Sequence, residues 1–379
     1  MGKRYTMIPK HTVKCRVRML SETEDYNHRL MNIPEFWKVT RGHGIKVAIM
    51  DSGVPNHIDL GPVEPHLSVI PGYYEDLNGH ATHVGGVIAA IAGNGIGVAG
   101  IAPDVEDHYV ACLDQDGGGD IEGLIDSIYW SVDQLGADII NMSLGVPAGA
   151  PRFRELEAAC NYAVSQGVPI IAAAGNEAGR VGQPAVYDCT IAIAAVNNRK
   201  EHARFSNTGP EVDFAAGGVD VYSTYLRNTY ARLSGTSMAA PAVCGIAALI
   251  LSKHKQQGVR LSPEELREHI RRIAYDIGPE GFDPRFGHGI PVYGHINAND
   301  PDHIPVPQDP GPEPQPRRRK GAKTMGPNPD CAYWKLWKSF IQAVDADLVC
   351  TENLRSALAS GITRLANHTE LIDRDIRDA

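Results

Sequence analysis

The sequence predicts an α/β protein in which a parallel β-sheet is flanked by helices. Between residues 45 and 300, short β-branched runs alternate with helical patterns, as is typical of parallel strands joined by helical crossovers. The runs that indicate buried strands are residues 45–50, 108–113, 138–142, 169–174 and 190–195. The 379 residues are 43% hydrophobic and 21% charged, a globular composition that allows one large core and a smaller appendage.

The clearest helix is predicted over residues 120–135. Asp120 can cap its N-terminus. Its apolar residues fall on one face, as expected for a helix that packs against a sheet, and they are Ile121, Leu124, Ile125, Ile128, Val132 and Leu135.

The chain changes character after residue 300. Residues 301–330 are rich in Pro and polar residues, bury too little apolar surface to fold, and are predicted to form an extended linker. Residues 331–379 regain helical periodicity and predict a small C-terminal extension of two helices. These helices are expected either to pair with a second copy of the chain, as in a short coiled coil, or to fold back on the preceding domain.

Charge and cysteine content exclude several classes of partner. The chain has 36 Lys and Arg against 45 Asp and Glu, a net charge of −9 that disfavours nucleic acid as a partner. We find no apolar run near the roughly 20 residues of a membrane span, so no membrane partner is expected. The seven cysteines are scattered without a CxxC pair, which indicates free thiols in a reducing compartment. The first residues lack the apolar stretch of a secretion signal, so a cytoplasmic location is expected.

Three segments supply the parts of a nucleophilic triad. Asp51 ends a buried strand, and His80 opens a helix in the string NGHATHV. Ser237 lies in the string GTSMAAP, where a loop enters an apolar helix. A serine hydroxyl becomes a good nucleophile when an imidazole takes its proton, and a carboxylate fixes the imidazole tautomer. The chain order Asp, His, Ser is one of the known orders of such triads.

With these three motifs in this order, the sequence from about residue 34 to 297 resembles the subtilisin-like serine proteases. The resemblance implies a subtilisin-like fold in which Asp51 orients, His80 is the general base and acid, and Ser237 is the nucleophile. It also implies that Asn176, at the end of the run IIAAAGNE, stabilises the oxyanion with its side-chain amide. His83, one turn beyond His80, is expected to be a packing residue.

The resemblance also implies a cleft for an extended peptide, held between two glycine-containing edges as an added strand. The first edge contains Gly117, Gly118 and Gly119, and the second is residues 141–145, which end at Gly145. The pocket for the residue before the scissile bond is expected to have small apolar walls and to accept many apolar side chains. Its walls would be Ser143, Leu144, Gly145, Ala173, Ala174 and Gly175, with Gly182 near the floor.

The glycine-rich stretch AGNGIGV resembles the calcium loop of the same family. Calcium takes six to eight oxygen ligands, and the resemblance implies a structural Ca²⁺ ion. A glycine-rich turn that binds no ion is the alternative. The implied ligands come from Asp59, Ala92, Asn94, Ile96 and Val98.

The N-terminal string Met7-Ile8-Pro9-Lys10 resembles the short propeptide motif of the intracellular subtilisins, the branch to which the sequence is most similar. Residues 1–20 are therefore expected to be an inhibitory segment that lies across the cleft, and residues 21–300 the protease domain. A frayed terminus is the alternative. Proline near the scissile bond distorts the peptide and removes an N–H, which would make cleavage unproductive.

The expected function is that of an intracellular serine endopeptidase that hydrolyses peptide bonds through an acyl-enzyme. It would cleave peptide and protein substrates with broad specificity and a preference for an apolar residue before the scissile bond. Two alternatives remain open. One is a maturation protease confined to one partner by its C-terminal tail, and the other is a catalytically silent scaffold.

Overall fold

The computed structural model describes residues 4–8, 13, 16–17, 21–61, 67–70, 72 and 74–295. The chain divides into two compact units, residues 1–308 and 309–379, and all described residues belong to the first. The predicted linker and both C-terminal helices lie outside the described residues and stay predictions.

The largest sheet formed by the described residues has seven strands in the order β10-β9-β8-β7-β3-β5-β4. All its pairings are parallel. Its strands along the chain are β3 (Lys46–Asp51), β4 (Leu67–Ser68), β5 (Glu106–Ala111), β7 (Ile139–Met142), β8 (Ile170–Ala173), β9 (Ile191–Val196) and β10 (Val212–Gly217). The α/β class with a parallel sheet flanked by helices is therefore confirmed.

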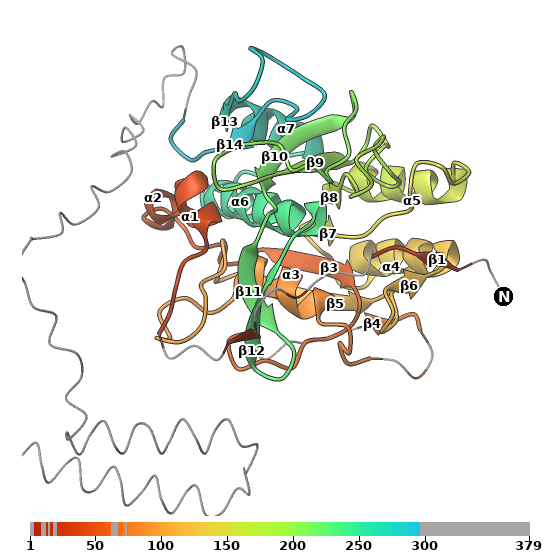
Figure 1. Cartoon of the computed structure of the whole chain (residues 1–379), viewed down its shortest axis with the longest axis horizontal. Coiled ribbons are helices and arrows are strands. Elements are labelled where there is room, and N and C mark those ends of the chain that lie inside the picture. The colour runs from red at the N-terminus through yellow and green to blue at the C-terminus, as the bar shows by residue number, and fades with distance from the viewer. Residues whose placement is uncertain are drawn as a thin grey trace, which may run out of the picture. The chain divides into compact units, whose positions relative to one another are not determined.

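Helices cover both faces of this sheet, with α3 and α6 on one face and α4 and α5 on the other (Figure 1). Along β3 the side chains alternate between the two layers: Val47 faces the first core and Ala48 the second. The helices are α3 (His80–Ala89), α4 (Ile121–Asp133), α5 (Arg154–Ser165) and α6 (Thr236–Gln256). The predicted cap of α4 is confirmed, because the Asp120 side chain accepts from the Gly123 N–H at 2.7 Å.

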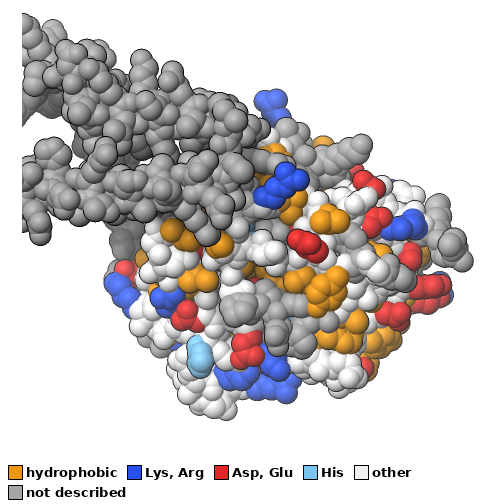
Figure 2. Space-filling model, turned by 90° about the horizontal axis from the view of Figure 1, so that it is seen from below, with side chains coloured by type: hydrophobic (Ala, Val, Ile, Leu, Met, Phe, Trp, Pro, Cys, Tyr) orange, Lys and Arg blue, Asp and Glu red, His pale blue; other side chains and the backbone are white. Residues whose placement is uncertain are grey.

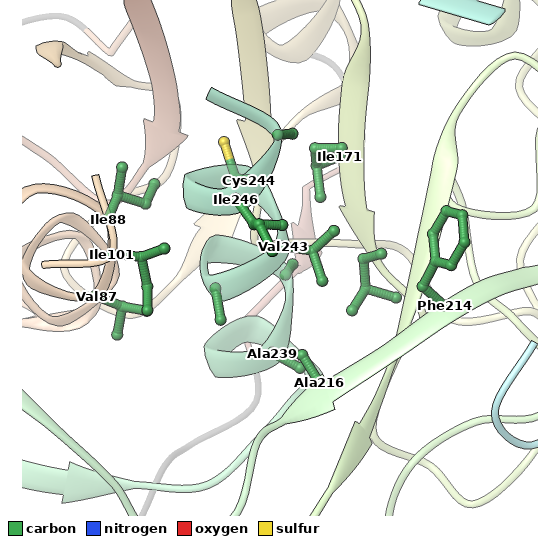
Figure 3. Packing of buried hydrophobic residues seen from close by; sticks show 14 of the residues in the cluster. Val87, Ile88, Ile101, Ile171, Phe214, Ala216, Ala239, Val243, Cys244 and Ile246 are labelled. Atoms are coloured by element: carbon green, nitrogen blue, oxygen red, sulfur yellow. The ribbon is translucent and has the colours of Figure 1, made fainter. Parts of the chain in front are cut away.

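Helix α6 runs through the centre of the first core. Figure 3 shows Val243 and Ile246 of α6 between residues of α3, such as Ile88, and residues of the sheet, such as Phe214. The expectation that no apolar run approaches the length of a membrane span was wrong, because α6 has 21 residues and a mean hydropathy of 1.4 in its most apolar window. Its window is 89% buried inside the protein, which is the packing of a core helix.

Smaller elements surround this framework. An antiparallel sheet joins β11 (Val221–Tyr225), β12 (Thr229–Leu233) and β2 (Arg16–Val17). Two further sheets have two strands each: β1 (Tyr5–Thr6) pairs with β6 (Gly118–Gly119), and β13 (Ala274–Tyr275) pairs with β14 (Ile290–Pro291). The remaining helices are α1 (Tyr26–Leu30), α2 (Ile33–Trp37) and α7 (Pro263–Arg272).

The five predicted strands are present, each within two residues of its expected bounds. Sequence reasoning missed β10, an edge strand whose Val-Asp-Phe-Ala-Ala-Gly sequence contains residues with low strand propensity. Among the described cysteines, Cys112, Cys160, Cys189 and Cys244 are free thiols, as expected. On the face that Figure 2 shows, acidic, basic and hydrophobic side chains of the described residues are interspersed.

Candidate active site

The candidate site lies at the carboxyl edge of the parallel sheet, where loops leave successive strands. Asp51 is the last residue of β3, and Asn176 follows β8 by three residues. His80 is the first residue of α3 and Ser237 the second of α6, and these two helices pack against each other.

Asp51 and His80 form a buried hydrogen-bonded pair. His80 Nδ1 lies 2.8 Å from Asp51 Oδ1 and 3.0 Å from Asp51 Oδ2. His80 is 2% exposed and Asp51 is 0% exposed. The backbone N–H of Ser52 also donates to Asp51 Oδ1, at 2.7 Å. Because a carboxylate only accepts, the proton lies on Nδ1, and His80 Nε2 is left as the basic nitrogen.

Asp76, which sequence reasoning missed, holds the first turn of α3. Its carboxylate accepts from the N–H groups of Gly79 and Thr82, both at 2.8 Å, and from the Thr82 hydroxyl at 2.6 Å. It also accepts from the Ser52 hydroxyl at 3.0 Å, and Ser52 Oγ accepts from the Ala81 N–H at 3.1 Å. These bonds tie the end of β3 to the start of α3, and thereby fix Asp51 relative to His80.

Asn176 is anchored to the start of α6 beside Ser237. Its Oδ1 accepts from the Thr236 N–H at 2.8 Å and from the Thr236 hydroxyl at 3.0 Å. Asn176, Thr236 and Ser237 all line the same cavity. With Oδ1 engaged, the Nδ2 amine is the part of Asn176 that can donate to a ligand.

Asn207 supports the loop that carries Asn176. Its Oδ1 accepts from the N–H groups of Glu177 and Gly179, and its Nδ2 donates to the Ala174 carbonyl. Gly175 has φ +110°, and a Cβ there would lie 2.2 Å from Asn207 Nδ2, so this approach requires glycine. Sequence reasoning missed Asn207 because it is 31 residues from Asn176 and belongs to no recognised motif.

A small cavity of about 20 Å³ remains next to Ser237. Ser143 is not among its lining residues; it is fully buried, and its hydroxyl accepts from Asn141 Nδ2 at 2.9 Å. The other six predicted pocket residues line the cavity, together with seven further residues that include the catalytic candidates Asn176 and Ser237. The lining is Met7, Leu144, Gly145, Val146, Pro147, Ala173, Ala174, Gly175, Asn176, Glu177, Gly182, Thr236 and Ser237.

The N-terminal segment lies on the glycine edge of the cleft. β1 pairs with β6 in antiparallel register, Tyr5 opposite Gly119 and Thr6 opposite Gly118. The Met7 N–H donates to the Gly117 carbonyl at 2.9 Å, and the Met7 carbonyl accepts from the Gly145 N–H at 3.1 Å. The segment thus bonds to both predicted edges.

Met7 and Ile8 are each 3% exposed, so their side chains are buried in this position. Gly117 has φ +73°, and a Cβ there would lie 3.0 Å from Ile8 Cβ. The backbone of the segment therefore approaches the edge closely because Gly117 has no side chain.

The predicted calcium ligands gather only in part. Asp59 is fully buried, its Oδ1 accepts from Asn94 Nδ2 at 2.5 Å, and its Oδ2 accepts from the Val98 N–H at 2.9 Å. Burial raises the pKa of the Asp59 carboxyl, and a cation beside it would offset this effect. However, two of the predicted ligand oxygens accept hydrogen bonds within the protein. The Ala92 carbonyl accepts from Arg41 Nη2 at 3.2 Å, and Asn94 Oδ1 accepts from the Ile96 N–H at 2.9 Å.

Asp59 and Asn94 are thus brought together, with their side chains hydrogen-bonded to each other. The described residues contain no group of three or more His, Cys, Asp or Glu side chains arranged to hold a metal. His83, expected to be a packing residue, is fully buried, with Nε2 3.1 Å from the carbonyl oxygens of Val221 and Ala231.

The chain matches the family model described as the subtilase family, Peptidase S8, over residues 42–289. It is 39% identical over 274 residues to minor extracellular protease Epr of Bacillus subtilis, a match that covers 71% of this chain and 41% of that protein. It is 40% identical over 258 residues to subtilisin DY of Bacillus licheniformis, covering 66% and 89% of the two chains. Subtilisin Savinase of Lederbergia lenta is 40% identical over 240 residues, covering 62% and 86%. The chain therefore belongs to the subtilase family and is a subtilisin-like serine endopeptidase homologue.

Proposed function

We propose that this chain is a serine endopeptidase that hydrolyses peptide bonds through an acyl-enzyme formed on Ser237. The observation that carries the proposal is the buried Asp51–His80 hydrogen bond at the sheet edge where α6 presents Ser237. His80 Nε2 would take the proton of Ser237 as the hydroxyl attacks, and later return it to the leaving amine. Asp51 would hold the tautomer and stabilise the imidazolium.

The oxyanion of the tetrahedral intermediate would be bound by Asn176 Nδ2 and the Ser237 N–H. The Ser237 amide belongs to the first turn of α6, whose N–H groups have no intrahelical acceptor. The positive end of the helix dipole favours negative charge at the same point. Both donors are fixed before the reaction, so little reorganisation accompanies charge development.

The test compares the chain with its Ser237→Ala variant in cleavage of unfolded casein and in labelling by an active-site serine reagent. The variant should lose both, with unchanged folding by circular dichroism, because only the nucleophile is removed. Cleavage by the variant would refute the assignment. If the wild-type chain is labelled yet leaves casein intact, it is confined to particular partners; if it does neither, it is a silent scaffold.

The proposed preference is for an apolar residue before the scissile bond, because Leu144, Ala173 and Ala174 give the cavity small apolar walls. A peptide series that varies this one residue measures it. Equal kcat/KM for leucine and glutamate there would contradict it.

We also propose that residues 1–20 inhibit the enzyme until they are displaced. The pairing of β1 with β6 and the burial of Met7 support this role, because a substrate strand would need the same edge. Substituting Met7 by Asp would place a charge against the apolar walls, and should shorten any lag in activity. Identical progress curves for both chains would count against inhibition.

A structural calcium ion at Asp59 and Asn94 is a further part of the proposal. An ion that binds only the folded chain stabilises it by mass action, about 2.7 kcal/mol at 100 times the Kd. A chelator should lower the Tm of the Ser237→Ala chain, whereas the additional Asp59→Asn change should remove this sensitivity. An unchanged Tm after verified metal removal would exclude the ion.

We also propose that the protein is intracellular and belongs with the intracellular subtilisins. The free thiols among the described residues support an intracellular location. The relative Epr is named as extracellular, so location has to be measured by fractionating cells of the source. Recovery of the chain only from the medium would overturn this part of the proposal.

A further inference from the structure

The N-terminal segment meets the cleft through a charged contact as well as through its backbone. Arg4 immediately precedes β1, and its Nη2 donates to Asp114 Oδ2 at 2.5 Å and to the Gly118 carbonyl at 3.0 Å. Gly118 is the β6 residue opposite Thr6. A substrate peptide could add to β6 in the same register, with one of its residues opposite Gly118 as Thr6 is. The residue two positions before that one would then place its side chain at Asp114, as Arg4 does.

Asp114 is held in place by its own loop. Its Oδ1 accepts from the N–H groups of Asp116 and Gly118, both at 2.9 Å, and Oδ2 is the oxygen that meets Arg4. The backbone closes the same turn, because Asp114 N–H donates to the Gly118 carbonyl at 2.9 Å. The Asp114 side chain is 24% exposed against 55% for Arg4, so a fixed, partly shielded carboxylate meets a more exposed cation.

We propose that Asp114 and the Gly118 carbonyl form a subsite for a Lys or Arg side chain of the peptide substrate. This inference rests on the proposed endopeptidase function and names a feature of its substrates, with residues 4–8 as the chain's own copy of such a peptide. Two acceptors facing one Nη2 suit a cation and would leave a carboxylate side chain repelled. The net charge of −9 also favours cationic peptides over acidic ones.

The subsite is separate from the apolar cavity. Arg4 lies three residues before Met7, which lines that cavity. Selectivity would thus combine an apolar residue with a basic residue upstream of it. Because the ion pair is partly exposed, we expect a modest preference of about three- to tenfold in kcat/KM, smaller at high salt.

The test uses quenched fluorescent peptides in which a single arginine moves through the positions upstream of the cleaved bond. Each has a partner with citrulline, the neutral isostere of arginine, at the same position. The full chain is used, and rates are expressed per active site by titration with a serine reagent. The Asp114→Asn variant is compared with Asp116→Asn, which makes the same charge change two residues away.

We expect one position at which arginine is preferred over citrulline, with this preference lost in Asp114→Asn and kept in Asp116→Asn. The proposal is overturned if no position discriminates, or if the preference survives in Asp114→Asn. A wild-type chain that neither labels nor cleaves would refute the endopeptidase function itself, and with it this inference.

A second measurement tests the contact between Arg4 and Asp114 in a chain that has no nucleophile. In the full Ser237→Ala chain, the amides of Met7 and Ile8 donate to the Gly117 carbonyl, and their hydrogen exchange reports release of the segment. Arg4→Gln and Asp114→Asn should each speed exchange about three- to tenfold, and the double variant should be no faster than either. Unchanged exchange in both single variants would show that Asp114 does not hold a cation.

Discussion

Helices α3 and α6 begin at the same edge of the sheet, yet their first turns differ in which backbone N–H groups have hydrogen-bond acceptors. Both have glycine at the N-cap, Gly79 and Gly235, and neither glycine can provide a side-chain cap. In α3 the buried carboxylate of Asp76 takes the place of the cap. In α6 the Ser237 N–H has no acceptor among the described residues.

This difference matches the two tasks of the helices. A closed first turn fixes the position of His80, whose role requires one orientation toward Asp51. In α6, where Asn176 Oδ1 accepts from the Thr236 N–H, the Ser237 N–H is left to donate to charge that appears only during the reaction. The same helix property, unpaired N-terminal amides, is thus used for positioning in one helix and is available for binding in the other.

The largest effect should come from Asn176→Ala, which removes a donor at the open turn. We expect kcat to fall about 100- to 1000-fold with little change in KM, the loss known for removal of such a donor in a subtilisin. Steady-state kinetics with titrated active sites measures it. Because Asn176 Oδ1 also accepts two hydrogen bonds from Thr236, the variant should lose about 1 kcal/mol of stability. A kcat within tenfold of wild type would remove Asn176 from the oxyanion site.

The closed turn is tested by Asp76→Ala, which removes the acceptor for five hydrogen bonds. We expect a loss of about 2 kcal/mol in the free energy of unfolding, because buried donors are left unpaired. Displacement of His80 should also lower kcat about tenfold or more.

Ser52→Ala is the matched, smaller change, because it removes one of those donors and the bridge to the Ala81 N–H. Denaturant unfolding in the Ser237→Ala background gives the stabilities, and kinetics of the single variants gives kcat. Equal effects of the two substitutions would show that Asp76 does not close the turn.

A smaller contrast is offered by Asp107, a half-buried residue with one buried carboxylate oxygen that caps no helix. Burial raises its pKa to about 6, above the usual value near 3.8. Between these values the folded chain binds more protons than the unfolded chain, so stability falls as pH rises from about 4 to 6. Asp107→Asn should therefore raise the free energy of unfolding above pH 6 by about 1 to 2 kcal/mol and flatten this part of the profile.

Thermal melting of the Ser237→Ala chain from pH 4 to 8, with and without Asp107→Asn, checks the expectation. Parallel profiles for the two chains would show that Asp107 titrates normally. In the same series, Asp76→Asn should lower the free energy of unfolding at neutral pH, whereas Asp107→Asn should raise it. The reason is that the Asp76 carboxylate accepts hydrogen bonds that an amide nitrogen cannot accept.

Much of the framework followed from local sequence patterns. Buried strands such as β3 and β7 are continuous apolar runs, and α4 combines an apolar stripe with a cap at Asp120. These signals lie within a few residues of each other and depend on backbone periodicity alone. Strand β10 lacked such a signal, because its place in the sheet comes from pairing with β9.

The sequence by itself determined the residue types and chain order of Asp51, His80, Ser237 and Asn176, since each lies in a short string with a recognisable strand end or helix start. Only the tertiary structure decided which groups hold them. Asn176 meets Thr236 across 60 residues, and Arg4 meets Asp114 across 110. Such contacts depend on how loops from separate strands converge at the sheet edge, and no local periodicity or spacing encodes that convergence.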